Sequence, residues 1–410
     1  LKRGVRMRNR MVKGKRLGAI LAIALAALLL LAACTPAPTV PEEEKVVEIG
    51  YIGTLTGAAA SSEQMVLASL QDYVRYFNEE IGISGGTVKV AWADDAFLLS
   101  AGISMYNRYV EKGITCVTTT HDTLQRALKL KCERDEVVSI SPSPYESLVY
   151  PAHAWTYFVV PTSAEQFACF ANYVKENWKE ERPPRLAFIH FDVPFGHEPV
   201  EQGTKYAQSI GIEMVPQEIV PFVPLDTSTQ LLRLSARGAD FVYIQAIPVA
   251  AGPVLRDAER LGLLGKIQFG GCEYSMGERL IEMIGPAAEG YLAPKRYPWW
   301  DESAMKTLAD NMAKYGAKIP MEPEYANWIT GAVLCEAIKR AIAELGYENL
   351  DGPAIKRAFD SMEDFDVHGV KKISYTLEDH RGSNKVMVYQ IRGGKIVPAS
   401  DWRMAPMLMP

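Results

Sequence analysis

Segments with strand character and segments with helix character alternate along most of this chain. Runs rich in β-branched and aromatic residues are followed by stretches whose apolar residues recur every three to four positions, as in amphipathic helices. Residues 46–52, 87–93 and 114–120 are expected to form the first three strands, with helices between them. Because parallel strands need a long crossover that is usually helical, this alternation predicts an α/β fold with a parallel sheet.

The same alternation starts again after residue 161, so a second sheet is expected. The folded part of about 365 residues is longer than one hydrophobic core usually serves, which also favours two lobes. Two such sheets facing each other would form a cleft. The tail alternates as antiparallel strands do. The strands expected in this half are 186–191, 219–223, 241–245, 267–270, 371–376, 385–391 and 395–398.

The N-terminal segment has the parts of an export signal. Basic residues are followed by the uncharged run 17–33, which is rich in Leu and Ala and ends in Leu-Ala-Ala-Cys34. That ending resembles the lipobox of bacterial and archaeal lipoproteins, which implies a lipid on Cys34. A single-helix membrane anchor is the alternative. We expect a signal peptide at 1–33 and a flexible Pro-rich and acidic tether at 34–45.

The charge balance argues against nucleic acid as a partner. The formal net charge of −5 includes the basic residues of the expected signal and no acid from it, so the mature chain is more acidic still. The five cysteines after Cys34 lack metal-ligand spacing, and we expect most of them to be small buried hydrophobic residues. A disulfide between two of them is the alternative in an exported protein. These cysteines are Cys116, Cys132, Cys169, Cys272 and Cys335.

Two polar loops follow neighbouring expected strands between Gly113 and Tyr145. In a parallel sheet both loops fall at the carboxyl edge, where ligands bind. Asp122 followed by Gln125 predicts an N-terminal capping box for the helix between the strands. Hydroxyl groups and free helix N–H groups there would form a cradle for a carboxylate or another anion. The alternative is that these residues only cap helices and shape turns.

The order of short motifs resembles the type I substrate-binding proteins of ABC transporters, in the branched-chain amino-acid and amide-binding branch. The resemblance covers 46–397 and implies two Rossmann-like lobes joined by three crossovers. Lobe 1 would comprise 46–161 and 294–375, and lobe 2 would comprise 162–293 and 376–410. The motifs are IGYIGTLTG, AWADDAF, KGITCVTTTHDT, VVSISPS, DVPFG, ADFVYIQA, GGCE and IGPAAEGYL.

The resemblance also implies a set of ligand-binding residues. Thr123 lies where the family has a hydroxyl that holds the ligand's carboxylate, and Glu273 lies where a carboxylate pairs with the ligand's ammonium group. Phe195 takes the aromatic position of the loop that closes over the ligand. Ser143 and Tyr145 belong to the loop that meets the ligand's polar head. The remaining candidates are His121, Asp122, Ile247 and Tyr325.

Several of these positions depart from the family pattern. His121 and Asp122 stand where small or apolar residues are usual, Tyr145 is larger than the expected hydroxyl residue, and Ile247 replaces a tyrosine. We expect Asp122 to be a helix N-cap, with a ligand contact as the alternative. These changes suit an amide, an aromatic acid or a larger amino acid.

No enzyme or metal motif stands out. The chain lacks GxxxxGK[ST] and HExxH, and Asp94-Asp95 is expected to cap a strand end. We therefore expect a monomeric, membrane-anchored extracytoplasmic receptor without a cofactor, which delivers a small ligand to an ABC permease. A ligand sensor that reports to a kinase or chemoreceptor, and an exported hydrolase of unfamiliar type, are the alternatives.

Overall fold

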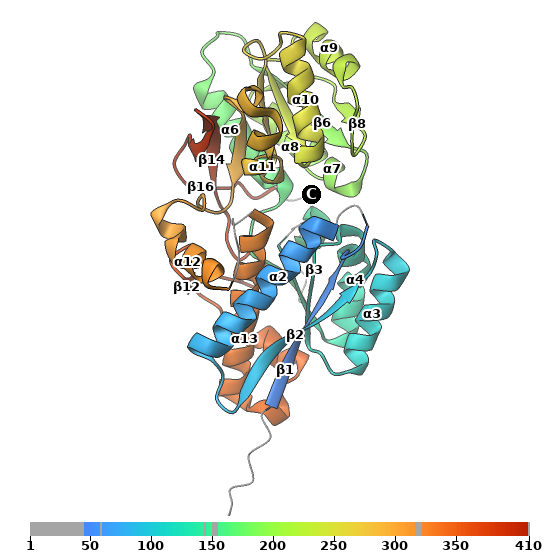
Figure 1. Cartoon of the computed structure of the whole chain (residues 1–410), viewed down its shortest axis with the longest axis vertical. Coiled ribbons are helices and arrows are strands. Elements are labelled where there is room, and N and C mark those ends of the chain that lie inside the picture. Colours follow the sequence, from blue (N-terminus) through green and yellow to red (C-terminus); the bar gives the residue numbers. More distant parts are fainter. Residues whose placement is uncertain (1–44, 58–59, 143–144, 150–154, 316–321, 409–410) are drawn as a thin grey trace, which may run out of the picture. The chain divides into compact units, whose positions relative to one another are not determined.

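The computed structural model describes residues 45–57, 60–142, 145–149, 155–315 and 322–408 (Figure 1). Residues Lys45–Pro410 form one compact unit. The expected signal peptide, Cys34 and nearly all of the tether lie outside the described residues.

The first sheet has five parallel strands in the order β2-β1-β3-β4-β5. Its strand order changes direction between β1 and β3, so the loops that follow these two strands open a crevice at the carboxyl edge. The strands are β1 (Lys45–Gly53), β2 (Gly86–Asp94), β3 (Cys116–Thr119), β4 (Val138–Ser141) and β5 (Thr156–Phe158). The helices between them are α2 (Ala60–Tyr76), α3 (Leu99–Glu111), α4 (Asp122–Asp135) and α5 (Glu146–Val149).

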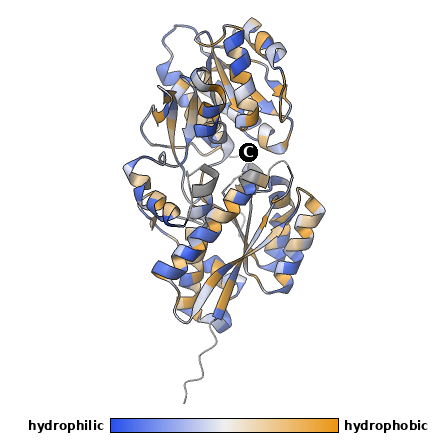
Figure 2. Cartoon of the chain, viewed as in Figure 1, coloured by the Kyte–Doolittle hydropathy of each residue, from blue (hydrophilic) through white to orange (hydrophobic). Residues whose placement is uncertain are grey.

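Helices cover both faces of this sheet. Ile49 and Ile140 pack with α2 and with α13 (Glu322–Leu345) and α14 (Gly352–Asp360) in one core cluster. Ile52 and Val117 point to the other face and pack with α3 and α4. The inner strands β3, β4 and β5 are short and buried throughout, whereas the outer strand β2 is largely only half-buried. Figure 2 shows that the surrounding helices carry both hydrophilic and hydrophobic residues. The helix α12 (Lys306–Lys314) joins the first cluster.

The second sheet has the order β15-β14-β11-β10-β9-β6-β7, with β8 beside β6 and β16 beside β14. Helices α6 and α8 pack on one face, and α9, α10 and α11 pack on the other. Its strands are β6 (Arg185–Phe191), β7 (Glu213–Met214), β8 (Glu218–Val220), β9 (Phe241–Gln245), β10 (Gln268–Gly271), β11 (Leu292–Lys295), β14 (Lys385–Arg392), β15 (Lys395–Pro398) and β16 (Arg403–Met404). Its helices are α6 (Ser163–Asn177), α7 (Pro194–His197), α8 (Val200–Ser209), α9 (Ser228–Ala236), α10 (Pro248–Arg260) and α11 (Glu278–Ile284).

The tail is antiparallel, as its alternation predicted. Strand β14 runs antiparallel to β11, β15 and β16 at the end of the second sheet. The expected strand at 371–376 is shorter but also antiparallel: β13 (Lys371–Ile373) pairs with β12 (Phe365–Val367) in a separate two-stranded ribbon. The period-2 pattern identifies strands, but it does not say which partner each strand takes.

The chain passes between the two sheets at 159–162, 296–305 and 374–384. Buried contacts hold these connections together. Thr162 caps α6 in a capping box with Glu165, and the buried Glu165 also accepts a hydrogen bond from Arg381 at 2.9 Å. The Tyr375 hydroxyl donates to the carbonyl of Phe158 at 2.7 Å. The first and third connections therefore lie side by side.

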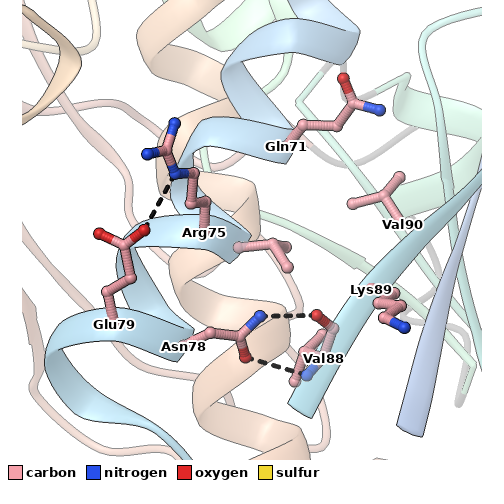
Figure 3. A pocket seen from close by; sticks show the side chains of 8 residues that line it. Gln71, Arg75, Asn78, Glu79, Val88, Lys89 and Val90 are labelled. Atoms are coloured by element: carbon pink, nitrogen blue, oxygen red, sulfur yellow. Dashed lines mark hydrogen bonds and ion pairs between the residues drawn. The ribbon is translucent and has the colours of Figure 1, made fainter. Parts of the chain in front are cut away.

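Asn78 stabilises the outer edge of β2. Its amide oxygen accepts from the Val88 N–H at 2.9 Å, and its amide nitrogen donates to the Val88 carbonyl at 2.8 Å (Figure 3). Both residues line a shallow pocket of about 370 Å³ beside α2, together with Gln71 and Arg75. This pocket lies along the flank of β2 and not at the carboxyl ends of the strands, so we do not regard it as the ligand site.

We expect Asn78→Ala to lower the free energy of unfolding by about 1–3 kcal/mol, because two backbone groups of β2 lose their partner. Urea unfolding followed by circular dichroism measures the change. Gln71→Ala is the control, since Gln71 is exposed and lines the same pocket; its effect should stay within about 0.5 kcal/mol. Equal effects of the two variants would contradict this role for Asn78.

Candidate functional site

A small, partly enclosed cavity lies at the carboxyl ends of strands from both sheets. Tyr145 reaches it from the segment after β4, Phe195 from α7 after β6, and Glu273 from the 3₁₀ turn after β10. Its volume of about 10 Å³ is close to the room that one water molecule needs. The remaining lining residues are Ser163, Gln166, Glu198, Tyr274 and Arg296.

Arg296 joins the parts of this cavity. Its guanidinium forms an ion pair with the Glu273 carboxylate, and both side chains are buried. The same guanidinium donates to the Pro142 carbonyl after β4 at 2.6 Å and to the Tyr274 hydroxyl at 2.6 Å. Arg296 follows β11 of the second sheet, and Pro142 follows β4 of the first. Arg296 therefore connects the strand-end loops of both sheets. A charge buried in this way needs such partners, because desolvation of an unpaired ion is costly.

Two lysines lie close to this ion pair. Lys295 is buried and donates to the backbone carbonyls of Glu273 and of Met276, the latter at 2.9 Å. Lys371 donates to the Val159 carbonyl at 3.0 Å and lies over the Tyr297 ring at 4.2 Å. Burial lowers the pKa of the Lys371 ammonium well below its usual range; the Arg296 charge adds to this effect, and Glu273 opposes it.

Tyr145 is a buried phenol at the cavity. Its ring lies 5.0 Å from the guanidinium of Arg126, which comes from α4. Burial raises the pKa of the Tyr145 hydroxyl well above its usual value, and the charges of Asp122 and Glu198 add to this. The hydroxyl therefore stays protonated and can donate a hydrogen bond.

A second buried polar cluster lies at the same edge of the first sheet. The Asp95 carboxylate accepts from the Thr54 hydroxyl at 2.8 Å and contacts the His121 ring nitrogen at 2.6 Å. It also accepts from the Phe97 N–H at 2.9 Å, and the Phe97 ring stacks on His121 at 4.7 Å. Burial favours a raised pKa for the Asp95 carboxyl, but these hydrogen bonds lower it overall.

These bonds hold a backbone of unusual conformation. Ala96 and Phe97 have φ angles of 48° and 61°, in the left-handed region that residues with a Cβ rarely adopt. Asp94 accepts from the Ala96 N–H at 2.9 Å and from the Leu55 N–H at 2.8 Å. The prediction that Asp94-Asp95 caps a strand end is therefore confirmed.

Glu63 at the start of α2 lies beside this cluster. One of its carboxylate oxygens accepts from the Tyr51 hydroxyl at 3.0 Å and from the Thr120 hydroxyl at 2.5 Å. Burial raises the pKa of Glu63, and this effect outweighs the two hydrogen bonds, which lower it. The folded state therefore favours a neutral Glu63.

The structure brings Tyr145, Phe195 and Glu273 together at the cavity, as the family resemblance implied. Phe195 contacts Tyr274 edge-on, with ring centroids 5.9 Å apart. Glu273, however, pairs with a side chain of this same protein. His121 is directed to Asp95, and Ile247 packs against the core of the second sheet at the start of α10.

The predicted capping box at Asp122 is wrong. Asp122 is the first residue of α4, and its carboxylate accepts from the Thr123 N–H at 2.6 Å and from the Thr123 hydroxyl at 3.2 Å. His121 takes the N-cap position without a side-chain cap bond. Instead, the Gln125 amide donates to the Thr119 carbonyl at 2.9 Å. Ser143, Cys34 and the side chain of Tyr325 lie outside the described residues.

Sequence reasoning missed Arg296, Tyr274 and Glu198. The signal for Arg296 was available, because Lys295 and Arg296 are two adjacent cations in an otherwise apolar and aromatic stretch, YLAPKRYPWW. Such residues are buried only when they are paired. The prediction for the cysteines is confirmed, since all five after Cys34 are buried and free.

Within the described part of the chain, no cluster of His, Cys, Asp or Glu is suited to a metal ion. Among the helices described there, none combines the length and the apolar character that crossing a membrane requires.

Two α/β sheets whose strand-end loops share a cavity are the arrangement of a binding protein of the type I periplasmic class. A profile of the periplasmic binding protein family matches residues 46–395. The chain therefore belongs to this family, which confirms the resemblance seen in the sequence.

Relatives and solved structures agree with this assignment. The Leu/Ile/Val-binding protein of Escherichia coli (strain K12) is 25% identical over 272 residues, which cover 64% of this chain and 71% of that protein. The Leu/Ile/Val-binding protein homolog 2 of Brucella abortus (strain 2308) is 23% identical over 246 residues, or 60% of this chain. The match spans 65% of that protein, slightly less than two thirds of its length.

Two solved structures share the fold. A branched chain amino acid ABC transporter structure from Thermus thermophilus with bound valine has a TM-score of 0.81 at 22% identity, and the match covers 88% of this chain and 97% of that one. A fatty acid ABC transporter substrate-binding protein from Thermomonospora curvata has a TM-score of 0.78 at 18% identity, with coverage of 89% and 95%. The α/β prediction is thus confirmed.

The raised pKa of Glu63 predicts a pH-dependent effect of Glu63→Gln. A neutral Glu63 stabilises the fold below its usual pKa, and this contribution is lost as the pH rises through the folded-state pKa. The variant should therefore gain stability relative to the wild type as the pH rises from about 4 to 8.

Thermal unfolding at several pH values measures this difference. Glu79→Gln is the control, because hydrogen bonds from Arg75 and Tyr315 lower the pKa of the exposed Glu79 carboxyl. The stability of Glu79→Gln relative to the wild type should therefore not rise with pH as that of Glu63→Gln does. A stability difference for Glu63→Gln that stays constant with pH would contradict a neutral Glu63.

Proposed function

We propose that this chain is the substrate-binding protein of an ABC importer, which captures a small organic ligand between its two sheets and presents it to a permease. The observation that carries the proposal is the cavity at which residues after β4, β6, β10 and β11 meet. Membership of the family supports it. The relatives named for leucine, isoleucine and valine, and the structures named for valine and fatty acid, favour an amino acid, an amide or a related acid.

Binding in this arrangement requires the strand-end loops to separate. A cavity of about 10 Å³ has no room for an amino acid, so the ligand has to enter when the loops of the two sheets move apart. The three connections at 159–162, 296–305 and 374–384 would act as the hinge. A ligand that contacts both sides shifts the equilibrium towards the closed form, because only that form provides all of its contacts.

The proposal includes the location of the protein. Periplasmic binding proteins act outside the cytoplasm, and we propose that a lipid on Cys34 holds this one, as a monomer, at the membrane surface. Lobe 1 would comprise 46–161 and 294–375, and lobe 2 would comprise 162–293 and 376–410.

Native mass spectrometry of the freshly purified chain tests the proposal. We expect a small molecule to be retained and to be released on denaturation, and the same compound should raise the melting temperature when it is added back. Turnover of a substrate, without any binding of amino acids, amides or organic acids, would contradict a transport role.

Phe195→Ala should lower the affinity for the retained ligand about five- to thirty-fold, because an aromatic contact at the cavity is lost. Isothermal titration calorimetry measures the change. Phe222→Ala is the matched control on the second sheet, since Phe222 stacks on Phe191 and is 48% exposed. Equal losses in both variants would remove Phe195 from the site.

A further inference from the structure

An outer parallel strand of each sheet is followed by a short ridge of exposed apolar residues. Phe97 and Phe222, the aromatic residues of the two ridges, are 65% and 48% exposed. Exposed apolar side chains that occur together can mark a site of protein interaction, whereas single ones are ordinary. The β2 ridge consists of Phe97, Leu98 and Leu99, and the β8 ridge consists of Phe222, Val223 and Leu225.

The fold holds the β2 ridge in a strained conformation. Ala96 and Phe97 both have left-handed φ angles, which are unfavourable for residues with a Cβ. The Asp95 carboxylate accepts from the Phe97 N–H at 2.9 Å, and the Asp95 carbonyl accepts from the Leu98 N–H at 2.8 Å. The Phe97 ring stacks on the buried His121, with ring centroids 4.7 Å apart. Strain that keeps an apolar ring in solvent points to a function for that ring.

The β8 ridge is held by a similar stack and by two prolines. The Phe222 ring stacks on Phe191, the buried last residue of β6, with ring centroids 5.0 Å apart. Pro221 and Pro224 flank the aromatic part of the ridge in the sequence, and each fixes its own φ angle. Each ridge therefore presents one exposed aromatic ring that rests on a buried ring.

The two ridges occupy equivalent places in the two sheets. The strand order β2-β1-β3-β4-β5 of the first sheet matches the order β8-β6-β9-β10-β11 in the second, so β2 and β8 lie at the same end. The first two connections between the sheets leave from β5 and β11, at the other end of that order. In a hinge rotation the displacement grows with the distance from the axis, so closure changes the spacing of the two ridges strongly.

We propose that the β2 ridge and the β8 ridge together form a docking surface for the extracytoplasmic face of an ABC permease, and that this surface is complete only when the two sheets have closed. The inference rests on the proposed function and adds the surface with which the chain meets its partner. A permease that accepts the loaded form has to distinguish it from the open form, and two ridges whose spacing depends on closure allow this. Because both ridges are apolar, the complementary patches on the permease are apolar as well.

A lipid surface and a second copy of this chain fit the ridges less well. The segments 92–99 (WADDAFLL) and 219–227 (IVPFVPLDT) contain Asp residues and neither Lys nor Arg, so anionic lipids would not attract them. A second copy could cover one ridge, but it would not require an equivalent ridge on each sheet. A permease requires both.

Biolayer interferometry on the full chain tests the proposal, with the permease–ATPase complex encoded beside it held in phosphatidylcholine nanodiscs. Phe97→Ser and Phe222→Ser should each lower the affinity of the ligand-loaded chain for this complex about tenfold or more, and neither should change the affinity for the retained ligand. Leu130→Ser and Leu377→Ser are the matched controls, since both residues are exposed and apolar but belong to α4 and to the third connection. Equal affinity of all four variants for the complex overturns the inference and leaves the proposed function standing. A loaded wild type that does not bind the complex overturns both.

Leu98→Ser and Val223→Ser repeat the test without altering the two stacked rings. A loss of docking confined to the phenylalanine variants would reflect damage to the stacks and would count against the inference. Sedimentation velocity and flotation with phosphatidylcholine and phosphatidylglycerol vesicles examine the other two occupants. Self-association or vesicle binding of the wild type that the ridge variants abolish, with docking to the permease complex unchanged, would assign the ridges to one of those occupants instead.

Discussion

The polarity of parallel strands is the constraint on which this structure depends. Each parallel strand must be followed by a crossover, so the loops after successive strands all lie at the same edge of the sheet. In the first sheet this rule collects Thr54, Asp95 and His121 at one edge, and in the second it collects Phe195 and Glu273. Loops far apart in sequence therefore meet at one edge, where side-chain contacts such as Arg296 to Glu273 then connect them. The cavity is a consequence of strand direction.

Much of the fold could be predicted from the sequence because it depends on local patterns. Apolar periodicity identified most strands of the second sheet and its antiparallel tail, but it missed β7, β11 and β16. The expected antiparallel strand at 371–376 exists as β13, but its partner β12 could not be predicted, because the period-2 pattern does not specify pairing. Asp122 was expected to cap α4, but the helix begins one residue earlier than this prediction requires, and the Asp122 carboxylate turns to Thr123.

The candidate site was less predictable because its central contact is long-range. The order of the motifs placed Tyr145, Phe195 and Glu273 at strand ends, and the structure brings them to one cavity. Nothing local in the sequence pairs Glu273 with Arg296, which lies after another strand. A buried ion pair of this kind is a weak contributor to stability but costly to break.

The side chain of Asn78 has a consequence for how this protein behaves among copies of itself. An outer strand with open N–H and C=O groups is a template on which another chain can add a strand, and this leads to aggregation. The Asn78 amide forms hydrogen bonds with both the N–H and the C=O of Val88 and so occupies the place of such a neighbour. One amide thus helps to keep the first sheet from joining with that of a neighbouring molecule.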